Sequence, residues 1–450
     1  MKSPRIGRPW QVYFYLGAWV GYFLLLWLLP IRYSPLESLT AATIMIAWVA
    51  VSVVVAGMAH TWTTRRGLAI SSMRHSDAIR AVTPAELRLV INVSLGLSIV
   101  GFISLFVDRI FVQHIDYSRG IAIAHELWRK EGEVREGVSS PLSVMGYLFG
   151  SSFFVATTFA QLHWELLKKL DRRLVLGVTF FLVAANSLLA GGRSIVLVQL
   201  ATIAAVGILR KILGLSFLPG RAVRTIAIAS VVMVLAVGYS LYVFSERASA
   251  GGILPGIYVE STVRHLSGET TEGFQDLDNM PLETGSLLQF GALAGAYLTH
   301  SYGIFESALE LEQRPGNTSF SMPRSLLFKM GIIDQADEEW PLAGRFLPLP
   351  GELWYDFGWV VCFVGAVIVG IMVGTAPALA NMFGGGILGI GVAVFALMTG
   401  LMSPIGLALD IMSVPFLMLS YMQLAVVGYL FYGNRCWWIA GRRVTVAFQS

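Results

Sequence analysis

The sequence predicts an all-α polytopic membrane protein with about ten transmembrane helices (ten to twelve) and a large external loop that contains helical or re-entrant segments. The 450 residues are 55% hydrophobic and only 13% charged, against roughly 25% charged residues in soluble domains. Long apolar runs recur along the chain, and about 20 apolar residues in a helix cross a hydrocarbon core of roughly 30 Å. This composition excludes a soluble enzyme and a disordered chain.

The apolar runs are the expected spans. Basic residues precede the first run, as in a signal peptide, but Pro30-Ile31-Arg32 stands where a small-residue cleavage site should be, so we expect a retained helix. Cys362 and Cys436 provide no disulfide framework, so lipid and helix packing hold the fold. The ten runs lie at about residues 10–31, 36–59, 89–107, 141–162, 174–190, 194–209, 225–244, 353–376, 385–403 and 405–432.

The distribution of Lys and Arg predicts the orientation. If all ten runs cross, 19 of the 32 basic residues lie on the side of the N-terminus. The short loop with Lys168, Lys169, Arg172 and Arg173 is the firmest anchor, and the positive-inside rule then puts both termini in the cytoplasm. Because the basic residues are split among loops, the net charge of +4 does not indicate a nucleic-acid partner.

The runs divide the chain into four parts. We expect seven N-terminal transmembrane helices in 1–244, a large periplasmic loop in 245–352, C-terminal transmembrane helices in 353–432 and a cytoplasmic tail in 433–450. Before its last residue the loop carries 14 acidic and 6 basic residues. Within it, 286–305 is apolar enough to enter the membrane, but a full crossing would put the basic tail outside. We therefore expect a re-entrant or interfacial helix there.

Several short strings resemble catalytic motifs only superficially. GGGILG at 384–389 opens an apolar span with no preceding strand, so helix packing explains it better than nucleotide binding, and the same holds for GAWVG, GYLFG and GIMVG. Asp276 and Asp278 match a D-x-D metal string, but we expect them outside, where nucleotide sugars are absent. The seven histidines show no ligand spacing. We therefore expect no metal and no cofactor.

Arg193 is the first candidate binding residue. It lies in AGGRS, between two closely spaced apolar runs. A snorkelling anchor is one explanation. However, topology disfavours positive charge on the outer side, and Gly191 and Gly192 would let an anion approach the guanidinium and the backbone amides.

A second cluster of charged and aromatic residues lies in the loop at 314–356, which leads into the apolar run at 353–376. Glu352 lies at the expected start of this helix, where an acidic residue can simply be a capping partner. The functional alternative places Glu352 beside an arginine-lined cavity, as a general base or as an orienting carboxylate. Trp354 and Tyr355 offer flat faces for sugar rings, and we expect Asp356 to be a structural charge. The basic residues of this cluster are Arg314, Arg324, Lys329 and Arg345.

The remaining candidates lie nearby in the sequence. His300 and Tyr302 form a polar cluster on the 286–305 segment, where an ionisable group at membrane depth is functional by default and a backbone-bonded histidine is the alternative. Arg264 lies in the same loop. For Asp410, in the last run, we expect a helix-packing hydrogen bond rather than a proton site.

Together these features resemble the O-antigen polymerase (Wzy-type) family of oligosaccharide repeat-unit polymerases. The resemblance rests on AGGRSIVL at 190–197, on a large external loop late in the chain and on LPGELWYDFGW at 349–359. Arg193 matches the arginine of the family's GGRS turn, and Glu352 matches the acidic residue of its PGELY-like string, although Trp354 intervenes before the tyrosine.

The resemblance implies a metal-independent membrane glycosyltransferase at the periplasmic face of the bacterial inner membrane. It would join undecaprenyl-pyrophosphate-linked oligosaccharides into O-antigen or a related surface polysaccharide. Its partners would be this lipid-linked substrate, the bilayer and a separate chain-length co-polymerase. The alternatives are an O-antigen ligase with the same donor, a polyprenyl-linked glycan transporter or flippase, and a non-catalytic scaffold.

The resemblance also implies roles for the candidate residues. Arginines stabilise the developing phosphate charge without a metal, and a base accepts the proton of the acceptor hydroxyl. In this interpretation Arg193 and Arg345 hold pyrophosphate, Arg324 or Arg264 assists, Glu352 or His300 is the base, and Tyr302 and Tyr355 contact the glycan.

Overall fold

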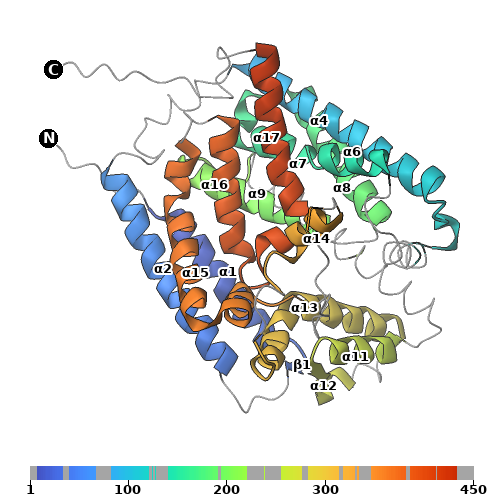
Figure 1. Cartoon of the computed structure of the whole chain (residues 1–450), viewed down its shortest axis with the longest axis vertical. Helices are drawn as coiled ribbons and strands as arrows, with labels where there is room; N and C mark the ends of the chain where they lie inside the picture. Colours follow the sequence, from blue (N-terminus) through green and yellow to red (C-terminus); the bar gives the residue numbers. More distant parts are fainter. Residues whose placement is uncertain are drawn as a thin grey trace.

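A computed structural model shows a helical bundle and confirms the expected fold class (Figure 1). In the described part of the chain, eight helices are long and apolar enough to cross a membrane. The structure describes residues 8–33, 40–66, 83–120, 124, 127, 140–190, 194–219, 238, 255–275, 282–313, 318–329, 332–333, 346–381, 386–411 and 413–432.

Most of the expected spans coincide with helices of the bundle. The expected run at 225–244 lies outside the described residues apart from position 238. The last helix begins at Ser413 rather than near 405, and the short 3-10 helix η7 (Ala408–Asp410) precedes it. The apolar helices are α1 (Trp10–Leu28), α2 (Thr40–Arg65), α4 (Pro84–Val107) continued by the π-helix η2 (Asp108–Val112), α6 (Pro141–Gly150) with α7 (Phe153–Leu162), α8 (Lys169–Ala190), α9 (Ser194–Ile212), α15 (Leu349–Asn381), α16 (Ile387–Met402) and α17 (Ser413–Tyr432).

The pair of strands β1 and β2 and the helices α11 and α12 lie with α13 at one end of the bundle, the lower end in Figure 1. The antiparallel pair of β1 and β2 places Arg32 opposite Glu269. Residues 286–305 lie within α13, a helix of 28 residues, and α13 is not among the eight candidate spans. The shorter elements are β1 (Ile31–Tyr33), η3 (Tyr117–Arg119), η4 (Trp164–Leu166), α11 (Pro255–His265), β2 (Gly268–Thr270), α12 (Glu272–Gln275), α13 (Leu282–Leu309), α14 (Ser321–Lys329) and η7 (Ala408–Asp410).

The opposite end of the bundle, which we call the basic end, is defined by Arg88, Arg210 and Lys211. Arg88 Nε lies 2.9 Å from Asp171 Oδ2, and Lys211 Nζ lies 5.7 Å from the ring centroid of Trp10. Segments that the charge pattern places on one side of the membrane thus meet at one end of the structure.

Arg210 connects the end of α7 to Glu165 at the basic end. Its side chain is fully buried, and its Nη1 donates to the carbonyl oxygens of Gln161 (2.6 Å) and Leu162 (3.1 Å) at the end of α7. Its Nη2 bonds Glu165 Oε1 at 2.6 Å. Burial raises the pKa of Glu165, but the hydrogen bonds and charge of Arg210 outweigh burial and lower it overall. The cation therefore satisfies carbonyl groups that no helical N–H reaches.

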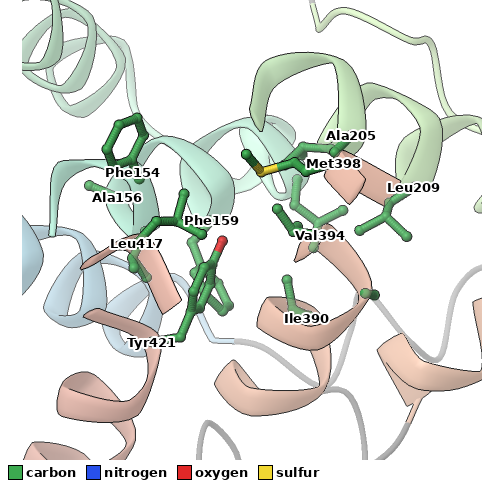
Figure 2. Packing of buried hydrophobic residues seen from close by; sticks show 14 of the residues in the cluster. Phe154, Ala156, Phe159, Ala205, Leu209, Ile390, Val394, Met398, Leu417 and Tyr421 are labelled. Atoms are coloured by element: carbon green, nitrogen blue, oxygen red, sulfur yellow. The ribbon is translucent and has the colours of Figure 1, made fainter. Parts of the chain in front are cut away.

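Two buried apolar clusters form the core. One includes residues of α7, α9, α16 and α17: Tyr421 lies beside Phe159, and Met398 lies beside Ala205 (Figure 2). The Tyr421 hydroxyl lies 2.7 Å from Thr158 Oγ1, so its polar end is paired. The other cluster joins α1, α2, α13 and α15.

Glycines bring α15 against α2. A Cβ at Gly370 would lie 2.5 Å from the carbonyl oxygen of Ser52, and one at Gly374 would lie 2.3 Å from that of Ala56. The packing role expected for GIMVG is therefore confirmed. For GAWVG the expectation is wrong, because no described atom lies within 4 Å of a Cβ placed at position 17 or 21.

We expect Gly370→Ala to destabilise the protein by about 1–3 kcal/mol, because the new methyl group meets backbone that cannot rotate away. Gly17→Ala is the matched control and should be neutral or stabilising by up to ~1 kcal/mol, since it lies in open space within a helix. Thermal unfolding of both variants in detergent tests this. Equal melting temperatures would contradict the close contact.

Arg210→Met should cost about 3 kcal/mol or more, because two buried carbonyl groups lose their donor. The neighbouring Lys211→Met removes only a cation–π contact and should cost less than ~1 kcal/mol. Chemical unfolding monitored by tryptophan fluorescence separates the two. A similar loss in both variants would refute the assigned role of Arg210.

Candidate functional site

Helix α15 is broken at Gly358. The backbone there has φ of 76°, outside the helical region. The Cys362 thiol donates to the carbonyl oxygen of Pro350 at 3.3 Å, and a Cβ at Gly365 would lie 2.2 Å from Leu353 Cδ1. Residues 353 and 365 would be ~18 Å apart in a straight helix. The segment 349–357 therefore folds back against the rest of α15.

This folded-back segment holds the carboxylate of Glu352 inside the protein. Glu352 is 4% exposed, and both of its carboxylate oxygens accept from the backbone N–H of Leu407 at 3.2 Å. The N–H of Leu349 donates to the carbonyl oxygen of Ser403 at 2.9 Å. A Cβ at Gly406 would lie 3.1 Å from Glu352 Oε1. The turn that follows α16 thus encloses the Glu352 carboxylate.

Two further carboxylates hold the start of α14. Asp356 and Asp410 accept hydrogen bonds from residues 318–322, so they neutralise the N–H groups that a helix start leaves unpaired. Asp410 lies on η7, not in the last helix as expected. The bonds are Thr318 N to Asp356 Oδ1 (3.0 Å), Ser319 N to Asp356 Oδ2 (2.6 Å), Phe320 N to Asp410 Oδ2 (3.0 Å), Ser321 Oγ to Asp410 Oδ1 (3.2 Å) and Met322 N to Asp410 Oδ1 (3.1 Å).

We call the region of Glu352, Asp356 and Asp410 the carboxylate end. Burial raises the pKa of Asp410 from 3.8 to about 6, and the negative charge of Asp356 adds to the rise. The N–H donors of Met322 and Phe320 lower it in part. Asp356 has the structural role expected from the sequence, because it binds two backbone N–H groups.

His300 connects α13 to the carboxylate end. Its Nδ1 lies 2.9 Å from the carbonyl oxygen of Tyr297, and its Nε2 lies 3.3 Å from the backbone N of Phe346. A carbonyl only accepts and an N–H only donates, so Nδ1 carries the proton and Nε2 accepts. His300 is 2% exposed. In this geometry it positions Phe346, the residue that follows Arg345, and its Nε2 lone pair is not open to a substrate.

The tyrosines do not present the faces that the sequence suggested. Tyr355 is 1% exposed and Trp354 is 6% exposed, and both lie in the apolar cluster around α1 and α15. The expectation that Tyr355 stacks on a sugar is therefore wrong, because protein atoms cover the ring. Tyr302 is also buried and packs edge-on against Tyr33. Burial raises the pKa of Tyr302, and the charge of Glu306 raises it further.

Of the four arginines predicted to bind the substrate, the structure describes two, and these lie on different helices. Arg324 lies half-buried on α14, the helix held by Asp356 and Asp410. Arg264 lies exposed on α11 and pairs with Glu260 at 3.0 Å, so the structure does not bring it to the carboxylate end. Arg193 and Arg345 lie outside the described residues.

Comparison with known proteins identifies no relative: no family model, no curated protein and no solved structure matches the chain. In the described part of the chain, no group of three or more His, Cys, Asp or Glu side chains is placed to hold a metal ion. The site is therefore defined by its own geometry, a buried carboxylate on a folded-back helix and an arginine-bearing helix held by two other carboxylates.

The raised pKa of Asp410 predicts a pH dependence of stability. The folded protein holds the Asp410 proton more tightly than the unfolded chain, so the free energy of unfolding should fall as the pH rises from about 4 to about 6. Asp410→Asn cannot ionise and should remove about 3 kcal/mol of this decrease, since each pKa unit corresponds to about 1.4 kcal/mol. Melting temperatures of the two proteins between pH 4 and pH 8 measure the difference. Parallel curves would contradict the assignment.

Proposed function

We propose that the chain is a membrane glycosyltransferase that polymerises undecaprenyl-pyrophosphate-linked oligosaccharide units, as in O-antigen synthesis. The observation that carries the proposal is the buried Glu352 carboxylate on the segment folded back at Gly358. Ionisable groups at such depth are rarely retained without a function, and broken helices within a membrane commonly line substrate cavities.

The chemistry suits this arrangement. The acceptor hydroxyl attacks the anomeric carbon of the donor sugar, the bond from that carbon to the pyrophosphate oxygen breaks, and the hydroxyl proton passes to the Glu352 carboxylate. Lipid pyrophosphate leaves with the bonding electrons. Guanidinium groups stabilise its developing charge by bidentate hydrogen bonds, a role that we assign to Arg193 and Arg345, with assistance from Arg324.

The geometry modifies the roles that the resemblance implies. Glu352 is a better base than His300, because His300 already accepts a backbone N–H through Nε2. We assign His300 to positioning, since its bond to Phe346 fixes the chain just after Arg345. Arg264 has no assigned role, because it pairs with Glu260 on the exposed face of α11.

The proposal includes an orientation. The basic end faces the cytoplasm of a bacterium together with both chain termini, and the carboxylate end faces the periplasm. Catalysis would then occur at the outer face of the inner membrane, where lipid-linked repeat units are available to a glycan-joining enzyme.

We expect Glu352→Gln to lower the polymerisation rate about 100-fold or more, because glutamine cannot accept the proton. Arg193→Ala and Arg345→Ala should also abolish the polymer, whereas the exposed Arg264→Ala should retain it. The measurement is a gel of surface polysaccharide from a deletion host that carries each variant, with membrane levels of the protein matched.

The gel pattern also separates the alternatives. A single capped repeat unit in the deletion host identifies a polymerase, and full-length polymer that accumulates on the carrier lipid identifies a ligase. Loss of all surface units would favour a flippase. An unchanged ladder in the Glu352→Gln and Arg193→Ala strains would refute the proposed function.

A further inference from the structure

Two phenylalanine rings lie exposed at the carboxylate end. Phe320 is 43% exposed and Phe346 is 38% exposed, although both adjoin buried polar groups. The Phe346 ring centroid lies 5.9 Å from that of His300. Neither ring belongs to the two apolar clusters of the core. A substantial part of each ring is therefore open to a ligand.

The backbone of Phe320 is in an unusual conformation. Its φ is +62°, a left-handed value that bulky residues rarely adopt. Carboxylates hold it there, because Asp410 binds the N–H groups of Phe320 and Met322 while Asp356 binds that of Ser319. Strain of this kind persists only where the surroundings enforce it, and it is concentrated at ligand clamps and active sites.

Phe320 and Phe346 both contact the same short turn, residues 406–410. A Cβ at Gly406 would lie 3.9 Å from Phe346 Cδ1, and Asp410 binds the N–H of Phe320. Four residues span at most ~14 Å. Between these points the N–H of Leu407 binds Glu352. The ring of Phe346 and the backbone of Phe320 therefore contact the same turn that binds the carboxylate to which we assign the role of base.

We propose that Phe320 and Phe346 form a glycan subsite that binds pyranose rings of the acceptor chain next to Glu352. This inference rests on the proposed function and extends it to the substrate contacts. A pyranose has an apolar C–H face that packs on an aromatic ring and hydroxyl groups that bind carboxylates and serines. Ligand sites typically combine aromatic walls with a few polar groups in this way.

The polar surroundings favour a sugar over the isoprenoid tail of the carrier lipid. Asp410 and Ser321 lie beside Phe320. Ser321 is exposed, so its hydroxyl can pair with a glycan hydroxyl. An isoprenoid chain would instead cover such polar groups without offering them partners.

A glycine substitution at position 320 tests the role of the aromatic ring without destabilising the fold. Phe320→Gly removes the aromatic face and relieves the left-handed strain, so the variant should be at least as stable as the wild type. Phe320→Trp keeps an aromatic face at the same place. The control is Phe180→Ala on α8, whose ring is also exposed but lies within a span away from the carboxylate end.

The experiment measures binding by calorimetry to the full-length protein in lipid nanodiscs. The probes are the oligosaccharide repeat unit released from the host polysaccharide and, separately, undecaprenyl phosphate. We expect Phe320→Gly to weaken oligosaccharide binding about tenfold and to raise the KM for the acceptor with little change in kcat. Phe320→Trp and Phe180→Ala should bind the oligosaccharide within twofold of the wild type, and undecaprenyl phosphate binding should not change.

Two results would overturn the subsite. Weakened binding of undecaprenyl phosphate alone would assign the ring to the lipid tail, and unchanged binding of both probes would leave it without a ligand. If the wild type polymerises while Phe320→Gly behaves normally, only the subsite fails. If the wild type binds the oligosaccharide through Phe320 but makes no polymer, only the proposed function fails.

Discussion

The left-handed backbone at Gly358 is the constraint on which the carboxylate end depends. A residue with a side chain would resist this φ, and a helix that continued through position 358 would carry Glu352 away from the 403–407 turn. The reversal is stabilised locally, by the contact between Leu353 and Gly365 and by the bond from Cys362 to Pro350. One flexible position thus converts an apolar span into a scaffold that holds a buried acid.

Charged side chains pair with backbone groups at both ends of the bundle, a cation with carbonyl groups at one end and carboxylates with N–H groups at the other. At the basic end, Arg210 satisfies carbonyl groups at the end of α7. At the carboxylate end, Asp356 and Asp410 satisfy N–H groups at the start of α14. Each charge neutralises backbone groups where a helix stops or starts, which a membrane environment demands because it provides no water. The need to pair backbone groups at helix ends therefore explains the charged residues at both the basic end and the carboxylate end.

The sequence predicts the bundle well because apolar runs of membrane length have few other structures available. It also predicts that Glu352 leads into the apolar run at 353–376 and that Asp356 is structural. It does not predict the burial of Tyr355, the placement of Asp410 on η7 or the strained Phe320, because these depend on how α14 and the turn after α16 meet. Glycine in the string DFGW was the available signal for the break, since glycine weakens a helix interior.

A disulfide cross-link between positions 353 and 365 tests the reversal at Gly358 most directly. Leu353→Cys and Gly365→Cys would be combined in a chain whose Cys362 and Cys436 are replaced by serine, with Val364→Cys in place of Gly365→Cys as the control that faces outward. The folded-back geometry predicts rapid oxidation of the 353–365 pair and little of the control. In a straight helix the two positions would be ~18 Å apart, too far for a disulfide. If neither pair oxidises, segment 349–357 does not fold back against the rest of α15.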